Sequence, residues 1–297
     1  MMQTKALEAV MEKLRLMSHN VWDMVENAPA WEKKGEDCSA EARAPGHVRV
    51  YKETMPDVIG WQESTQIMCD RVKEGCAEIG INYTVIFGRF TPIFYRADKL
   101  DLVDTEFFTY PEKIEGFEGC FNNMRSKSCN IAVFRTKAEG KMFIFASTHL
   151  WWMREDEDTK VNQPHMYLPG SNTAREMQMA MLIEKVEKYR EKYHCPAILV
   201  GDFNTDYNSK ASRYTMSKGY RHAHDIATDF TDETMGYHLC FAWGYVKEYM
   251  DKGYQAALDH IFITGENEGA VKRFERYSPE YYFPISDHSA AFIDIEF

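Results

Sequence analysis

The stretch LVGDFNTD, residues 199–206, ends a short apolar run with a glycine and two oxygen-bearing side chains, Asp202 and Asn204. Gly, Asp and Asn are common in turns, and either side chain could bond to its own backbone. Carboxylate and amide oxygens at the end of a buried strand are also the ligands that hard cations prefer. The stretch alone leaves both interpretations open, and the rest of the chain decides between them.

The size and charge of the chain limit what it can do. With 297 residues, 44% of them hydrophobic, it can form one large domain or two small ones. We find no linker-like boundary, so we expect a single domain over residues 1–297. The formal net charge is −11 and no Lys/Arg run exceeds two residues, which disfavours a basic face for duplex DNA. A small phosphate ester or a short nucleic acid remains compatible with this charge.

The sequence shows no sign of a membrane span or a secretion signal. It contains no stretch of about 18 uncharged apolar residues, the length that a membrane-spanning helix needs. The first residues carry charges throughout and lack the apolar core of a signal peptide. Seven scattered cysteines without a CxxC pair indicate reduced thiols rather than a disulfide framework or a zinc ribbon. We therefore expect a cytoplasmic protein.

Apolar patterning predicts an α/β protein in which short strands alternate with a few helices. Strands are expected at residues 14–21, 57–63, 83–88, 91–96, 129–135, 141–150, 197–200, 258–264 and 289–297. Helices are expected at residues 3–13, 64–80 and 173–193, the last opened by a capping box of Thr173 and Glu176. Residues 23–47 are expected to form a long loop, and residues 206–256 an irregular region. Short turns between strands favour two mostly antiparallel sheets packed face to face, with helices outside.

Polar side chains recur where these strands begin or end. They are Asn20, Glu63, His149, Asp202, Asn204, Asp259, His260, Asp287 and His288. Each one alone is more often a turn residue or a structural histidine. Strand ends at one edge of a sandwich converge in space, so the whole set together predicts a site.

Four carboxylates dominate this predicted site: Glu63, Asp202, Asp259 and Asp287. They could not lie close together while ionised without a compensating charge, which a divalent cation would supply. Oxygen ligands without a thiolate favour Mg²⁺ or Mn²⁺ over zinc. Nearby histidines are suited to proton transfer or to stabilising developing charge.

An ordered set of short motifs runs through the chain. They are WQE (61–63), STHL (147–150), GDFN (201–204), LDHIF (258–262) and SDH (286–288). In this order and spacing they resemble the endonuclease/exonuclease/phosphatase superfamily, over a range from Asn20 to His288. The resemblance implies a four-layer α/β sandwich and metal-dependent hydrolysis of a phosphodiester or phosphomonoester.

The resemblance also implies a role for each matching residue. Glu63 resembles the main metal-binding residue of the family and Asn20 its first-strand asparagine, while Asp287 resembles a further metal or water contact.

The remaining matches imply catalytic roles. His149 matches the histidine that contacts the scissile phosphate. Asp202 and Asn204 match the pair that positions or deprotonates the attacking water and holds the phosphate. His288 resembles the catalytic histidine, and Asp259 the carboxylate that orients it.

The substrate side of the site departs from many relatives. Trp151 and Trp152 follow the STHL motif, and Lys127 stands where many relatives carry an arginine. Arg125, Lys127 and Trp152 are candidate substrate contacts, although a solvated turn is the commoner setting for the two basic residues. Arg175, in the first turn of a helix, is expected at the surface or in an ion pair.

Three functions remain open from the sequence. The first is a Mg²⁺-dependent hydrolase of a small or short phosphate ester. The second is a nuclease acting on DNA or RNA, whose bases aromatic residues could stack. The third is a catalytically silent binding module on the same fold, which the complete set of motif residues disfavours.

Overall fold

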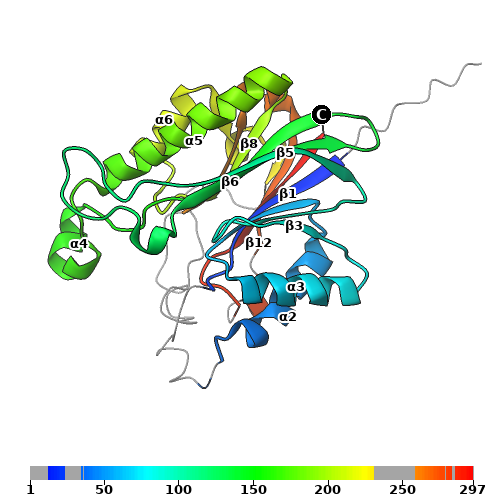
Figure 1. Ribbon diagram of the computed structural model, residues 1–297, viewed down its shortest axis with the longest axis horizontal. Coiled ribbons are helices and arrows are strands. Elements are labelled where there is room, and N and C mark those ends of the chain that lie inside the picture. The colour runs from blue at the N-terminus through cyan, green and yellow to red at the C-terminus, as the bar shows by residue number, and fades with distance from the viewer. Residues whose placement is uncertain are drawn as a thin grey trace, which may run out of the picture.

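The computed structural model describes residues 13–23, 35, 37–230, 258–277, 279–282 and 285–296, which form two β-sheets with helices outside (Figure 1). The seven-stranded sheet has the order β10 (Asp229–Phe230), β12 (Val271–Tyr277), β13 (Ala290–Glu296), β1 (Lys13–Asn20), β2 (Val58–Gln62), β4 (Ile93–Tyr95) and β3 (Thr84–Ile86). The six-stranded sheet has the order β5 (Leu100–Thr109), β6 (Ser128–Thr136), β7 (Met142–His149), β8 (Ala197–Asp202), β11 (Asp259–Thr264) and β9 (Tyr220–His222). Most neighbours are antiparallel; the β1–β2, β7–β8 and β10–β12 pairs are parallel.

The helices form the two outer layers (Figure 1). Helices α2 (Ala40–Thr54) and α3 (Gln66–Glu78) cover the seven-stranded sheet, whereas α5 (Ser171–Tyr193) and α6 (Lys210–Ser217) cover the six-stranded sheet. The shorter helical segments are α4 (Glu157–Asn162), α7 (Ala223–Ile226), η1 (Asn123–Arg125), η2 (Pro164–Met166), η3 (Gly265–Ala270) and η4 (Glu280–Tyr282). The predicted four-layer α/β sandwich is confirmed. Within the residues described, no helix is long and apolar enough to cross a membrane.

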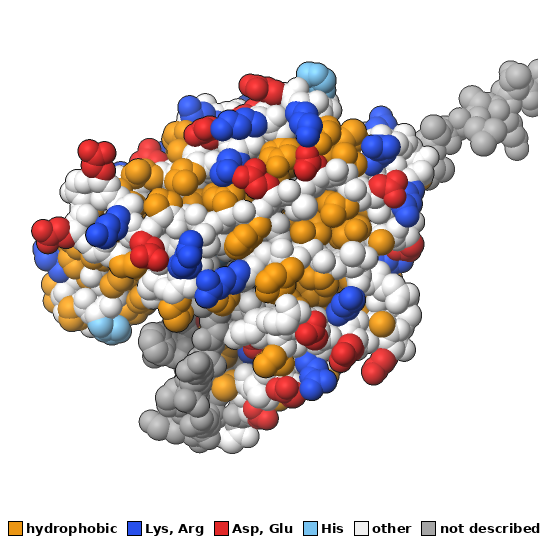
Figure 2. All heavy atoms as spheres, viewed as in Figure 1, with side chains coloured by type: hydrophobic (Ala, Val, Ile, Leu, Met, Phe, Trp, Pro, Cys, Tyr) orange, Lys and Arg blue, Asp and Glu red, His pale blue; other side chains and the backbone are white. Residues whose placement is uncertain are grey.

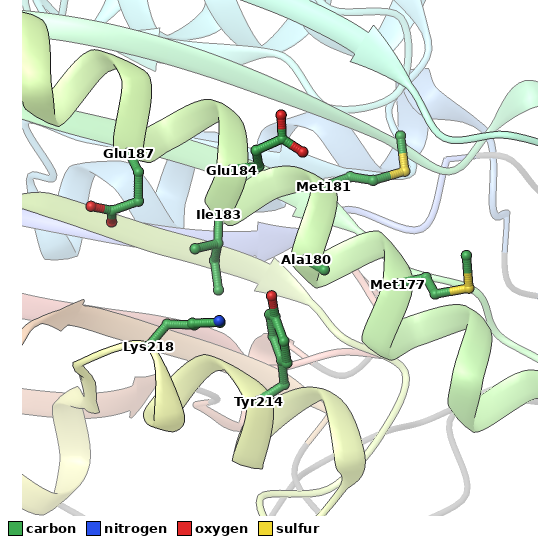
Figure 3. Close-up of a pocket in the computed structure, with 8 residues that line it drawn as sticks. All are labelled: Met177, Ala180, Met181, Ile183, Glu184, Glu187, Tyr214 and Lys218. Atoms are coloured by element: carbon green, nitrogen blue, oxygen red, sulfur yellow. The ribbon is translucent and has the colours of Figure 1, made fainter.

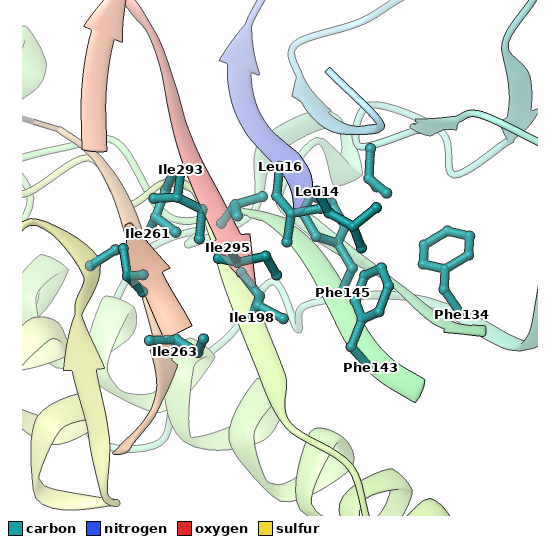
Figure 4. Packing of buried hydrophobic residues seen from close by; sticks show 14 of the residues in the cluster. Leu14, Leu16, Phe134, Phe143, Phe145, Ile198, Ile261, Ile263, Ile293 and Ile295 are labelled. Carbon is teal, nitrogen blue, oxygen red and sulfur yellow. The ribbon is translucent and has the colours of Figure 1, made fainter. Parts of the chain in front are cut away.

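The space between the sheets is filled by aliphatic and aromatic side chains (Figure 4). The labelled members come from both sheets: Leu14, Leu16, Phe134, Phe143, Phe145, Ile198, Ile261, Ile263, Ile293 and Ile295. All of them are buried, and each such side chain contributes roughly 1.5–3 kcal/mol relative to exposure. This core fixes the two sheets against each other and thereby positions the ends of their strands.

Two glycines allow the sheets and strands to approach closely near the predicted site. A Cβ at Gly60 in β2 would lie 2.7 Å from the Cβ of Ser147 and 2.8 Å from a methyl of Val200, both in the other sheet. A Cβ at Gly201 would lie 2.0 Å from the carbonyl oxygen of Thr148. The glycine of the GDFN motif is therefore required by the close packing of β8 against β7.

The predicted loop over residues 23–47 is wrong at its C-terminal end, because helix α2 begins at Ala40. Ser39 caps this helix, and its side chain accepts from the amide of Ala42. Pro45 and Gly46 lie inside the helix and made the sequence resemble a loop. Packing of its buried face against the seven-stranded sheet outweighs their low helix propensity.

Helix α5 begins earlier than the predicted capping box. Its N-cap is Gly170, with a φ of 88°, so Thr173 already lies within the first turn. The left-handed conformation, which glycine adopts without strain, turns the chain into the helix before Thr173 is reached.

Several elements were missed in the sequence. Strands β5 and β12 carry charged residues on half-exposed faces, which hides their alternation. The region expected to be irregular contains α6, β9, α7 and β10. Residues 231–256 of that region lie outside the described residues, as does the predicted helix at 3–13 apart from Lys13, which begins β1.

Candidate active site

Three neighbouring strands of the six-stranded sheet place polar side chains in one row, named the polar row: His149, Asp202 and Asp259. In the strand register His149 lies opposite Asp202, and Asp202 lies opposite Asp259. The first two end β7 and β8, and Asp259 begins β11. All three are buried. Hydrogen bonding between the strands thus fixes the spacing of these side chains.

The seven-stranded sheet brings two more predicted residues to the polar row. Asn20 Nδ2 donates to Asp202 Oδ2 at 3.1 Å, and Asn20 Oδ1 accepts from the amide of Trp22 at 2.9 Å. Glu63 follows β2 with a φ of 57°, a left-handed conformation that turns the chain out of the sheet. Its Oε1 lies 3.7 Å from His149 Nε2. Both residues therefore reach the row from the opposite sheet.

The loop before β13 supplies Asp287 and His288. His288 Nδ1 lies 2.7 Å from Asp259 Oδ2, so the carboxylate accepts from the ring and fixes its orientation. His288 Nε2 lies 3.8 Å from Asp202 Oδ2 and 3.9 Å from Asp287 Oδ1. Among the described residues, no donor hydrogen-bonds to this buried oxygen of Asp287. One imidazole thus faces three carboxylates, which together favour a further positive charge.

Lys127 and Asn204 both reach the ring of His149. Lys127 Nζ lies 2.6 Å and Asn204 Nδ2 3.0 Å from His149 Nε2. Since an ammonium and an amide nitrogen are donors, Nε2 acts as the acceptor. Asn204 Nδ2 also lies 3.1 Å from the carbonyl oxygen of Leu150 and 3.3 Å from Asp202 Oδ2. Two donors therefore converge on His149 Nε2, at one end of the polar row.

Burial changes the ionisation of these groups. Loss of hydration raises the pKa of Asp202 to about 6 and the pKa of Asp287 to about 7, and neighbouring carboxylates add to this effect. Burial also lowers the pKa of Lys127 to about 8, against the attraction of nearby carboxylates. It holds the pKa of His149 well below its usual range. At neutral pH His149 is therefore neutral, while Lys127 is mostly charged.

The other candidate substrate contacts lie outside this cluster. Arg125 is exposed, on the η1 turn beside Lys127. Trp152 is half-buried, with its ring centroid 5.8 Å from that of Trp151. The surface position expected for Arg175 is wrong, because its guanidinium is buried. It donates to the carbonyl oxygens of Trp151 and Met153, in the loop that follows β7. These buried backbone oxygens need a hydrogen-bond donor, and Arg175 supplies it.

Arg43 supports the site and was missed in the sequence. Its buried guanidinium donates to the carbonyl oxygens of Val21 and Ile285, at 2.7 and 2.9 Å, and to Asp23 Oδ1 at 3.0 Å. The amide of Asp23 donates in turn to the carbonyl oxygen of Glu63. One side chain thus ties together the segments that follow β1 and β2 and precede β13. Recognising residues 40–54 as a helix would have placed Arg43 on its buried face.

Two overlapping groups of side chains have donor atoms close enough to hold a cation. They are Glu63 with His149 and Asp202, and Asp202 with Asp259 and His288; within each group the donor atoms lie within 4.8 Å of one another. Their carboxylate-rich chemistry fits a hard divalent ion.

A separate apolar groove lies between α5 and α6 (Figure 3). It has a volume of about 460 Å³ and is lined by Met177, Ala180, Met181, Ile183, Glu184, Glu187, Tyr214 and Lys218. None of these residues belongs to the predicted site.

Known proteins resemble this chain in sequence and in fold. The CCR4-Not complex 3'-5'-exoribonuclease subunit Ccr4 of Debaryomyces hansenii is 25% identical over 234 residues, which cover 66% of this chain and 26% of that protein. The chain thus spans about a quarter of this curated relative. A mannosyl-6-phosphatase of Bacteroides thetaiotaomicron has a structure with a TM-score of 0.71 at 21% identity, covering 96% of this chain and 100% of the other.

A second protein of Bacteroides thetaiotaomicron, an endonuclease/exonuclease/phosphatase family protein, has a TM-score of 0.72 at 20% identity, over 96% of this chain and 98% of the other. At these identities the two solved structures establish the fold alone. The sequence profile of the Endonuclease/Exonuclease/phosphatase family matches residues 48–288, which is most of the chain. On this evidence the protein belongs to the Endonuclease/Exonuclease/phosphatase family.

Proposed function

We propose that this protein hydrolyses a phosphate ester by metal-assisted, in-line attack of water, with Mg²⁺ or Mn²⁺ as its cofactor. The observation that carries the proposal is the polar row, which Asn20, Glu63 and His288 join from the seven-stranded sheet. A phosphate ester repels an anionic nucleophile, so such a site must neutralise charge and orient a water molecule.

The metal would be held by Glu63 and Asp287 with Asn20 beside them, next to the group in which the donor atoms of Glu63, His149 and Asp202 lie within 4.8 Å of one another. Asp287 Oδ1 is buried without a hydrogen-bond donor among the described residues, as expected of an atom reserved for a cation. Asn20 Oδ1 retains a lone pair after accepting from Trp22. A bound divalent ion would polarise the phosphoryl oxygen and stabilise charge on the leaving oxygen.

Asp202 is the residue that we assign to the attacking water. Asn20 Nδ2 and the amide of Asn204 bind its two oxygens, at 3.1 and 2.7 Å. Both bonds restrain the carboxylate, so it can orient the water or accept its proton in a fixed geometry.

Three donors are assigned to the charge that develops on the phosphate: Lys127, Asn204 and His288. His149 Nε2 accepts from both Lys127 and Asn204 and would hold these two donors beside the phosphate, where Lys127 supplies a buried ammonium. His288 is oriented by Asp259. Donors fixed before reaction stabilise a transition state at little cost in reorganisation.

A nuclease is the second candidate, because the curated relative is an exoribonuclease and Trp152 presents part of an indole ring two residues after Leu150. A short single strand could stack on such a ring. The exposed Arg125 could then contact a neighbouring phosphate. The net charge of −11 disfavours a long duplex, so we expect weak, strongly salt-dependent binding to duplex DNA.

A substrate panel tests these assignments. It would include a phosphomonoester, a phosphodiester, sugar phosphates, single-stranded RNA and DNA, and duplex DNA, each with Mg²⁺ and then with excess EDTA. We expect turnover with Mg²⁺ that the chelator abolishes. Undiminished turnover in EDTA would contradict the role of the metal, and no turnover of any compound would favour a silent binding module. Selective cleavage of single strands would identify the nuclease.

A further inference from the structure

Two buried histidines lie behind the loop that carries Asn204. His260, in β11, is the residue after Asp259, and His222 ends β9. His222 Nε2 lies 3.1 Å from His260 Nδ1, and His260 Nε2 lies 2.8 Å from the carbonyl oxygen of Thr205. Both side chains are almost completely buried, and neither belongs to the machinery assigned above.

The partners of these rings determine where their protons lie. A carbonyl oxygen can only accept, so His260 Nε2 carries a proton and donates to Thr205. A neutral His260 then has a bare Nδ1, which accepts from His222 Nε2. His222 Nδ1 is left to accept from the amide of His224 at 3.3 Å. The two neutral rings therefore form a relay of hydrogen bonds that runs in one direction, from the amide of His224 to the carbonyl of Thr205.

This relay ends beside a strained residue of the site. Asn204 has a φ of 51°, a left-handed conformation that costs free energy and persists where the surrounding structure imposes it. The amide of Phe203 donates to the carbonyl oxygen of Leu258 at 2.8 Å, and His260 binds the carbonyl of Thr205. The backbone is thus held on both sides of Asn204. These bonds set the direction of its Nδ2, which contacts His149 Nε2.

We propose that His260 and His222 are positioning residues, which hold Asn204 in the geometry needed for phosphoester hydrolysis. This inference rests on the proposed function. Neither ring would touch the substrate; each acts through the backbone of the GDFN loop. His260 also adjoins Asp259, so β11 supports the loop of Asn204 and the partner of His288 at neighbouring positions.

Paired substitutions at residue 260 test the role of the donor. His260→Phe keeps an aromatic ring against Phe203 but removes the donor, and we expect kcat to fall about tenfold or more with little change in KM. His260→Gln retains a nitrogen that can donate to Thr205 and should recover most of kcat. His222→Phe leaves His260 without its own donor and should give an intermediate loss.

A matched control separates positioning from stability. Ile263 lies on the same strand as His260, in the core between the sheets. The substitution Ile263→Ala should lower the melting temperature at least as much as His260→Phe, because it leaves a cavity in that core. Its kcat should remain near that of the parent protein. If kcat follows melting temperature across all four variants, or His260→Gln is no better than His260→Phe, the positioning role is wrong.

A spectroscopic measurement on the unsubstituted protein is independent of catalysis. Long-range ¹H–¹⁵N spectra of the histidine rings distinguish protonation at Nδ1 from protonation at Nε2. We expect both His222 and His260 to carry the proton on Nε2 at neutral pH. A proton on Nδ1 of His260 would contradict the relay of hydrogen bonds even if the protein is active. Inactivity together with the expected tautomers would contradict the proposed function but not the relay.

Discussion

The two sheets contribute to the site in different ways. The six-stranded sheet supplies His149, Asp202 and Asp259 from the first or last residues of strands, aligned by the register of β7, β8 and β11. The seven-stranded sheet supplies Glu63 and Asp287 from loops beyond the strand ends. The register of a sheet fixes the first group, whereas the second depends on side chains that hold its loops.

Arg43 is one of these supporting side chains. Its buried guanidinium bonds to the segments that follow β1 and precede β13, and Asp23 in the first of these segments donates through its amide to the carbonyl oxygen of Glu63. We therefore expect substitutions in the polar row to lower the proposed activity and to leave the fold intact. Substitutions in the loop supports should instead change how well the metal is held.

The largest effect is expected at the centre of the row. Asp202→Asn keeps the size of the side chain but removes the carboxylate assigned to the water, so kcat should fall by about 10³, within the usual range for a positioned acid–base group. Asp206→Asn, an exposed change in the same loop, is the matched control. Steady-state kinetics on both variants test this prediction, and a near-normal kcat for Asp202→Asn would remove Asp202 from the mechanism.

The next largest effect is expected at His288. His288→Ala should lower kcat by about 10², because a group that stabilises charge in the transition state is lost. The residue belongs to none of the hydrophobic clusters, so the melting temperature should change little.

The partner of His288 provides a second comparison. Asp259→Asn should also lower kcat, and the double variant should resemble His288→Ala, because the carboxylate acts through the ring. Additive losses would show that the two residues act separately. A large loss of stability with near-normal kcat would instead make His288 a structural residue.

A smaller effect is expected at the loop support. Arg43→Lys keeps the charge but cannot reach all of the acceptors of the guanidinium, so the loops should loosen. We expect the dissociation constant for Mn²⁺, measured by calorimetry without substrate, to rise about tenfold, which is roughly 1.4 kcal/mol. Arg49→Lys on the exposed face of the same helix is the control and should leave it unchanged. Equal metal affinity in both variants would contradict the supporting role.

The contrast between residues placed by strand register and residues on supported loops also explains which parts of the site the sequence could predict. Asp202 and Asp259 could be found because a polar residue that starts or ends an apolar run is visible locally. The strand register then brought them together without further information. Arg43 could not be found in this way, because Pro45 and Gly46 made its helix resemble a loop and its acceptors are distant in sequence.

Two other features could not be predicted from the sequence: the contact between His222 and His260, and strand β5. His222 and His260 are 38 residues apart in sequence, and nothing near either residue indicates the other. Strand β5 was missed because Asp101, Asp104 and Glu106 lie among its apolar residues. Its position at the edge of a sheet permits that composition, since one side of the strand faces solvent.

The smallest expected effect is on the pH dependence of stability, and it comes from His19 on the buried face of β1 behind the site. His19 precedes Asn20 and lies between the hydroxyl groups of Tyr51, at 2.8 Å from Nδ1, and Tyr282, at 2.7 Å from Nε2. Burial lowers the pKa of His19 to about 3, from an ordinary value of 6.5. Its contribution to stability is therefore complete above about pH 6.5 and is lost as the pH falls toward 3, because the unfolded chain takes up the proton first.

For this one histidine, lowering the pH from 7 to 6 should reduce the free energy of unfolding by about 0.7 kcal/mol. His19→Gln should remove that part of the pH dependence, even if the variant is less stable at every pH. Denaturant unfolding at a series of pH values measures the slope directly, with His165→Gln as an exposed control. If the unfolding free energy of His19→Gln depends on pH as steeply as that of the parent protein, His19 keeps an ordinary pKa in the folded state. Its ring would then be protonated as readily as an exposed histidine, despite its place behind Asn20.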